Sequence, residues 1–151
     1  GVHLVLDASF LQSDYAIMIP KTADGRVLFA VPWHDKVVVG TTDTLMKHAL
    51  LEPVALEQEI DFILNTAGKY LTKPPQRKDV LSVFAGLRPL AAPRSEDKKT
   101  KEISRSHKLI VEKSGLITII GGKWTTYRKM AQDTIDLAYA KMHLKAPECV
   151  T

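Results

Sequence analysis

The chain of 151 residues is long enough to bury a core of its own, and its 45% hydrophobic and 25% charged residues are those of an ordinary globular protein. No apolar run approaches the roughly 18 to 20 residues of a membrane-spanning helix, and the single cysteine, Cys149, excludes an internal disulfide framework and a cysteine-based zinc site. The net charge of +4 fits either a modest basic excess on the surface or an anionic ligand, and the cations lack the dense runs with interleaved aromatics that favour nucleic acid.

Strands are predicted for the N-terminal third of the chain. Residues 2–6 are rich in β-formers. Segments 15–20 and 26–32 flank a polar connection with the dipeptide Asp24-Gly25, which is typical of hairpin turns. Segment 36–40 follows after a Trp-His-Asp turn, so the last three segments are predicted to form an antiparallel meander.

A helix is predicted for residues 56–71. Apolar side chains recur there at helical spacing and form one stripe. Glu57 and Glu59 stand in the first turn, where the helix dipole favours acidic groups, and Pro74-Pro75 closes the segment. The stripe consists of Leu56, Ile60, Ile63, Leu64, Ala67 and Leu71.

The C-terminal half predicts more strands and a second helix. Residues 80–90 predict a strand that contains a glycine, and 103–112 is expected to pair with 116–120. The helix is expected at about 124–142, with one face made of Trp124, Tyr127, Ala131, Ile135, Ala138 and Met142. Because strands dominate beside two main helices, the sequence predicts an α+β fold with a mainly antiparallel sheet, in a single domain over residues 1–151.

The segment GGKWTTYR, residues 121–128, joins a predicted strand to the last helix through Gly121 and Gly122. Such a junction lets the backbone approach a ligand closely and aims free N–H groups outward. Lys123 adds a positive charge, and Thr125 and Thr126 can cap the amides or contact the ligand. The pattern predicts an anion site, with a plain strand-to-helix turn as the alternative. The spacings of a phosphate loop and of a GxGxxG dinucleotide fingerprint do not occur in the chain.

Arg88 lies in the apolar segment FAGLRPL, residues 84–90. An arginine in an apolar strand is unfavourable unless a partner receives it, and strand alternation places Arg88 on the face of Ser82 and Phe84. A ligand contact is one interpretation. The other is an edge-strand arginine that points to water, with which Pro89 agrees.

Two further segments have open interpretations. In ISRSHKL, residues 103–109, alternation puts Arg105 and His107 on one face, either as a ligand wall or as solvated residues at the start of a strand. GTTD, residues 40–43, favours a turn whose side chains bond the local backbone. The histidines show no HxxxH or HExxH spacing, so no metal site is predicted, and the absence of GxSxG gives a serine hydrolase no support.

Five segments in order resemble FAD-dependent glycerol-3-phosphate dehydrogenases. They are GVHLV, FAVPW followed by GTTDT, DVLSVFAGLRPL, SRSHKL and GGKWTTYRKMA. The resemblance extends from Gly1 to about Ala140. GTTD or GGK alone is a weak signal, but the ordered set with FAGLRPL and GGKWTTYR intact is specific.

The resemblance implies a flavoenzyme in two parts. This chain corresponds to the substrate domain, whose mainly antiparallel sheet covers the flavin, and the Rossmann-like FAD domain lies outside it. The implied reaction oxidises sn-glycerol 3-phosphate at C2 to dihydroxyacetone phosphate, with FAD as cofactor and electrons passed to membrane quinone. The full-length enzyme is then expected on the cytoplasmic side, peripheral to the inner face of a membrane.

The resemblance also implies roles for particular residues. Arg88 and Arg105 match substrate-binding arginines, which suit a phosphate because of their planar fork of donors. Lys123 matches a lysine at the flavin and substrate site. His3 matches a histidine near the reacting carbon and is the candidate base for the C2 hydroxyl proton, although Arg88, Arg105 or Lys123 could polarise that hydroxyl instead. The Gly121-Gly122 turn, with Thr125 and Thr126, would face the pyrimidine edge of the flavin.

Two rival functions remain open at this point. A glycerol-3-phosphate oxidase delivers electrons to oxygen and shares the substrate site, and a noncatalytic anion-binding module would need no flavin. The chain by itself is expected to fold but to be inactive and to bind FAD weakly or not at all. The contacts to adenine, ribose and pyrophosphate belong to the fingerprint of the FAD domain.

Overall fold

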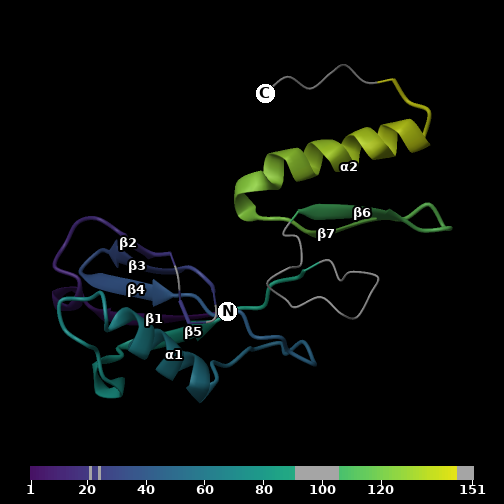
Figure 1. Ribbon diagram of the computed structural model, residues 1–151. Helices are drawn as coiled ribbons and strands as arrows, with labels where there is room; N and C mark the ends of the chain where they lie inside the picture. Colours follow the sequence, from purple (N-terminus) through teal and green to yellow (C-terminus); the bar gives the residue numbers. More distant parts are fainter. Residues whose placement is uncertain (21, 24, 91–105, 146–151) are drawn as a thin grey trace. The chain divides into compact units, whose positions relative to one another are not determined.

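The computed structural model describes residues 1–20, 22–23, 25–90 and 106–145 (Figure 1). Contacts divide the chain into two compact units, Gly1–Leu87 and Arg88–Thr151. Sheets and helices occur in both units, so the predicted α+β class is confirmed. Arg105, Asp24 and the loop around residues 94–101 lie outside the described residues.

The first unit contains a five-stranded antiparallel sheet in the order β2-β3-β4-β1-β5. Its strands are β1 (Val2–Asp7), β2 (Ile17–Ile19), β3 (Leu28–Trp33), β4 (Lys36–Gly40) and β5 (Ser82–Ala85). The predicted meander is confirmed, because β2 pairs with β3 and β3 pairs with β4. Strand β1 lies between β4 and β5, which brings segments far apart in the sequence side by side.

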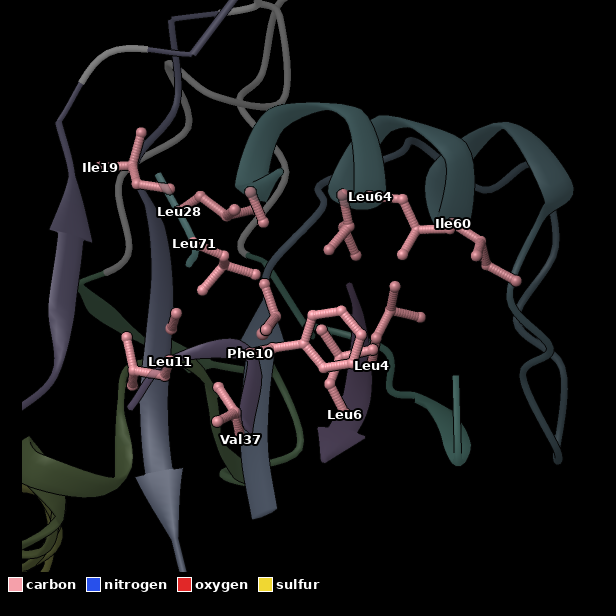
Figure 2. Close-up of a cluster of buried hydrophobic side chains, with 14 of the residues drawn as sticks. Leu4, Leu6, Phe10, Leu11, Ile19, Leu28, Val37, Ile60, Leu64 and Leu71 are labelled. Atoms are coloured by element: carbon pink, nitrogen blue, oxygen red, sulfur yellow. The ribbon is translucent and has the colours of Figure 1, made fainter. Parts of the chain in front are cut away.

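The core of the first unit lies between this sheet and helix α1 (Glu57–Ala67) (Figure 2). Along β1 the side chains of Val2, Leu4 and Leu6 are buried, and those of His3 and Val5 lie on the opposite face. Burial of each such aliphatic side chain contributes about 1.5–3 kcal/mol. The core therefore fixes which residues of β1 face outward, and His3 is one of them. The buried partners from α1 are Ile60, Ile63, Leu64 and Ala67.

Helix α1 is shorter than predicted, because it ends at Ala67 and not at residue 71. Gly68 follows, and a side chain there would come 3.3 Å from Pro74 Cβ and 3.0 Å from the Leu64 carbonyl oxygen. The returning chain thus packs directly on this glycine. Leu71 still reaches the core, since its N–H bonds the Ala67 carbonyl at 3.0 Å in a final turn.

The second unit contains a two-stranded antiparallel sheet and one long helix. Strands β6 (His107–Val111) and β7 (Ile117–Gly121) form the predicted hairpin, which turns at Gly115 with φ +90°. A 3-10 turn (Trp124–Thr126) leads into helix α2 (Tyr127–Lys141), so the regular helix starts three residues later than predicted. Figure 1 shows α2 running alongside the hairpin.

The apolar face predicted for α2 is not the face that meets the hairpin. Trp124, Tyr127 and Ile135 are 89%, 63% and 54% exposed. Met130 and Asp133 lie on the other side and contact the hairpin residues Gly122 and His107. No residue of α2 is fully buried, and Met130, Leu137, Ala138 and Tyr139 are half-buried.

Candidate functional site

His3 occupies a row that crosses four strands of the first sheet. The register places it opposite Gly40 of β4 and Phe84 of β5, and Phe29 of β3 lies beyond Gly40. The imidazole stacks on the Phe84 ring, with centroids 5.1 Å apart and planes 11° from parallel. Phe84 therefore fixes one side of the histidine.

Gly40 provides the space on the other side of His3. A Cβ at this position would come 2.8 Å from His3 Cγ and 2.9 Å from Nε2, which is closer than real carbon contacts allow. The glycine thus lets the imidazole lie flat across the backbone of β4. His3 is half-buried and has one defined orientation, which is what a proton-transfer group needs.

A groove of about 700 Å³ lies on this outer face of the sheet. The His3 row forms one end, and Trp33 with Lys36 forms the other, as the strand register requires. Between them the lining is mostly aliphatic and aromatic. Such a surface, with a few polar groups at defined places, is typical of a small-molecule site. The apolar lining residues are Val5, Phe29, Val31, Trp33, Val38 and Phe84.

The predicted local turn at GTTD is wrong in one respect, because Thr42 bonds residues far away in the chain. Its buried hydroxyl oxygen accepts the N–H of Val2 at 3.0 Å and donates to Glu59 Oε1 at 2.6 Å. Thr44 donates to the same oxygen at 2.7 Å, and the Leu56 N–H donates to Glu59 Oε2 at 3.0 Å. The segment after Gly40 is thereby tied to β1, next to His3, and to α1.

Glu59 is a buried carboxylate. From the sequence it is expected only as an acidic residue in the first turn, favoured by the helix dipole. Burial alone would raise the pKa of Glu59, but hydrogen bonds from Thr42, Leu56 and Thr44 outweigh it and hold the pKa below its ordinary value. Glu59 therefore stays ionised and anchors this loop. The sequence does contain a signal for this role. Glu59 stands three residues after Leu56, the position from which a helix side chain reaches back to accept the N–H of the residue that precedes the helix.

The predicted anion site in the second unit has the backbone expected of it. Gly121 and Gly122 have φ of +76° and +82°, which only glycine adopts without strain. Thr126 stabilises the turn, since its hydroxyl accepts from the Lys123 N–H at 3.2 Å and donates to the Lys123 carbonyl at 3.0 Å. The side chains of Lys123, Thr125 and Thr126 are exposed. Thr126 is thus a local cap, and Lys123 and Thr125 are open to a ligand.

His107 is not the solvated residue that one interpretation expected, and its place in a ligand wall stays a prediction. Its Nε2 lies 2.8 Å from Asp133 Oδ2 on α2, and its side chain is 18% exposed. It joins strand to helix within the second unit.

The predicted strand at 80–90 is too long, because β5 ends at Ala85. Arg88 follows it half-buried, in a segment where the Leu90 N–H bonds the Arg88 carbonyl, so the alternation argument does not apply to it. Pro89 offers no N–H for a strand ladder. The placement of Arg88 and Arg105 in one phosphate site remains a prediction.

Among the described residues, no group of three or more potential ligands could hold a metal ion. Within the same part of the chain, no helix has the length and apolar character needed to cross a membrane.

The profile of the FAD dependent oxidoreductase family matches residues 1–128. The chain belongs to this family. Two curated relatives are mitochondrial glycerol-3-phosphate dehydrogenases, one from Mesocricetus auratus with 45% identity and one from Arabidopsis thaliana with 46%. Each alignment covers 100% of this chain but only 21% and 24% of the relative.

A solved structure has the same fold. The glycerol-3-phosphate dehydrogenase from Bacillus halodurans, complexed with FAD, superimposes with a TM-score of 0.77 and a sequence identity of 35%. The match covers 97% of this chain and 27% of the Bacillus halodurans chain. The chain therefore spans about a quarter of the length of these proteins. The resemblance noted from the motifs is confirmed.

Proposed function

We propose that this chain is the substrate-binding part of an FAD-dependent glycerol-3-phosphate dehydrogenase, which oxidises sn-glycerol 3-phosphate to dihydroxyacetone phosphate. The arrangement of His3 between Phe84 and Gly40 carries the proposal. The reaction removes a hydride from C2 and a proton from the C2 hydroxyl. When bound, FAD supplies the hydride acceptor, and the protein must supply a group for the proton.

His3 is suited to take that proton. Histidine exchanges protons near neutral pH. Phe84 and Gly40 hold its ring in one plane, and the groove beside it is lined mostly by apolar side chains. A substrate hydroxyl that hydrogen-bonds this imidazole would meet a base that is already oriented.

The Gly121–Lys123 turn fits the flavin of this family. Its two glycines keep side chains away from a flat ligand, and Lys123 places a positive charge beside the turn. Cations and free amides near the pyrimidine edge of a flavin stabilise the negative charge that develops there on reduction. Arg88 and Arg105 would receive the substrate phosphate, with Thr125 as a further polar contact at the turn.

The electron acceptor and the cellular site belong to the same proposal. Both curated relatives are named as mitochondrial. We propose that the full-length enzyme works at a membrane surface and passes electrons to quinone, with the remaining part of its chain holding FAD. Oxygen consumption measured with and without added quinone separates this from an oxidase.

Substitution of His3 tests the proposal directly. In the full-length flavoenzyme, His3→Gln keeps a polar group but removes the base, and general-base catalysis typically contributes about 10²–10⁴-fold. Flavin reduction by glycerol 3-phosphate should slow by about 100-fold or more, with normal FAD content. His48→Gln is the matched control, because His48 is exposed and lies outside the groove. Equal reduction rates for the two variants would exclude His3 as the base.

A further inference from the structure

The Gly121–Lys123 turn is held from two sides within the second unit. A Cβ on Gly121 would come 2.8 Å from the backbone oxygen of Ser106, just before β6. A Cβ on Gly122 would come 2.6 Å from Met130 Cε of α2 and 3.4 Å from His107 Cβ. The turn thus lies against both the strand and the helix, and its shape depends on the distance between them.

A side-chain link joins the strand to the helix beside this turn. His107 stands opposite Gly121 in the hairpin register, and its Nε2 is 2.8 Å from Asp133 Oδ2, three residues after Met130 on α2. The pair is shielded, with side chains 18% and 27% exposed. Lys129 binds the other oxygen of Asp133 at 2.8 Å. The hydrogen bond from Lys129, followed by that from His107, holds the pKa of Asp133 below its ordinary value.

No residue of α2 is fully buried in this chain, and the link to His107 ties the helix to the hairpin beside the Met130 contact with Gly122. Without the link, the helix is freer to tilt away from the hairpin. A tilt would open the space that Met130 and His107 now fill beside Gly122. Lys123 and the amides before Tyr127 would then lose their fixed position.

We propose that His107 and Asp133 are positioning residues, which clamp β6 to α2 and so hold the Gly121–Lys123 turn in the geometry that receives the cofactor and substrate. The proposal rests on the function proposed for the turn. Neither side chain touches the ligand. Their effect passes through the turn, so it should appear in the mobility of the turn and in the rate of flavin reduction together.

The test uses the full-length flavoenzyme with His107→Leu, Asp133→Leu and the double variant. Hydrogen exchange of the amides of residues 121–126 should speed up about tenfold or more, as loss of a charge-assisted bond would cause. Flavin reduction should slow with FAD content unchanged, and the double variant should be no worse than either single one. Asp136→Leu is the control, since Asp136 is exposed on the same helix.

Conservative variants separate the link from general damage. In His107→Gln the amide can still donate to Asp133, so exchange and reduction should return most of the way to the parent values. Asp133→Asn keeps an acceptor oxygen and covers the case in which the leucine variants fail to fold. It should give a smaller effect than Asp133→Leu.

Unchanged exchange at residues 121–126 in the leucine variants would overturn the clamp, as would a His107→Gln variant as impaired as His107→Leu. A different result is also possible: the leucine variants show faster exchange, but Lys123→Met reduces its flavin at the normal rate. It would show that the turn has no role at the flavin, and it would overturn the catalytic consequence of the clamp.

Discussion

Gly40→Ala is the substitution for which the structure predicts the most specific effect. The added methyl carbon would clash with three atoms of the His3 ring, Cδ2 nearest and then Cγ at 2.8 Å and Nε2 at 2.9 Å, and Phe84 blocks the ring on its other side. The imidazole must therefore turn out of its place. Overpacking of this kind costs about 1–3 kcal/mol, and loss of the stacked pair contributes about 0.5–1.5 kcal/mol of that.

A double-mutant cycle measures this strain. Denaturant unfolding of the chain should show Gly40→Ala destabilised by about 1–3 kcal/mol in the parent sequence. In a His3→Ala background the clash is absent, so the same substitution should be close to neutral. The coupling free energy between the two positions should then equal most of the single-variant effect.

An equal destabilisation in both backgrounds would refute the reasoning, because the cost would then come from β4 itself. The full-length enzyme offers a second check. A shift of about 1 Å in a reacting group can cost about 10²-fold in rate, so Gly40→Ala should slow flavin reduction strongly. A normal rate would mean that the orientation of His3 is not needed.

Three further predictions follow from other sites. The pKa of Glu59 is lower in the folded than in the unfolded chain, so its ionised form stabilises the fold above the unfolded pKa. This stability is lost as the pH falls through the lower folded pKa. The free energy of unfolding of Glu59→Gln should therefore change less between pH 7 and pH 3 than that of the parent. Arg88→Ala in the full-length enzyme should lower kcat/KM for glycerol 3-phosphate by about tenfold to a hundredfold, whereas an unchanged value would remove Arg88 from the phosphate site. Calorimetric titration of this chain alone with FAD should show weak binding or none, and micromolar affinity would mean that it holds most of the cofactor by itself.

The sequence located the elements of the first unit well where short apolar runs end in clear turn signals. Residues 36–40 became β4 with those bounds, and the meander follows from alternation and turns. Predictions failed where tertiary contacts decide. Helix α1 ends at Ala67, and Pro74 lies close to the Gly68 that follows; no periodicity in residues 56–71 carries that information.

Periodicity also finds an apolar stripe without showing what covers it. On α2 the stripe through Tyr127 and Ile135 is exposed, and the hairpin meets the other side through Met130 and Asp133. Likewise, Glu59 fits a helix N-terminus from sequence alone. Its burial and its bonds to Thr42 and Thr44 appear only when the loop after β4 folds over α1.

The order of strands explains why motifs that are weak singly become specific together. GVHLV contains His3, GTTD begins with Gly40 and FAGLRPL begins with Phe84, and the placement of β1 between β4 and β5 brings these three residues into one row. The glycine makes room for the imidazole and the phenylalanine stacks on it, so each motif contributes the part that the others need. In the second unit Gly122 makes room in the same way for Met130 and His107. Both candidate sites are therefore built from a glycine that accommodates a neighbouring side chain, and substitution at either glycine should disturb that neighbour first.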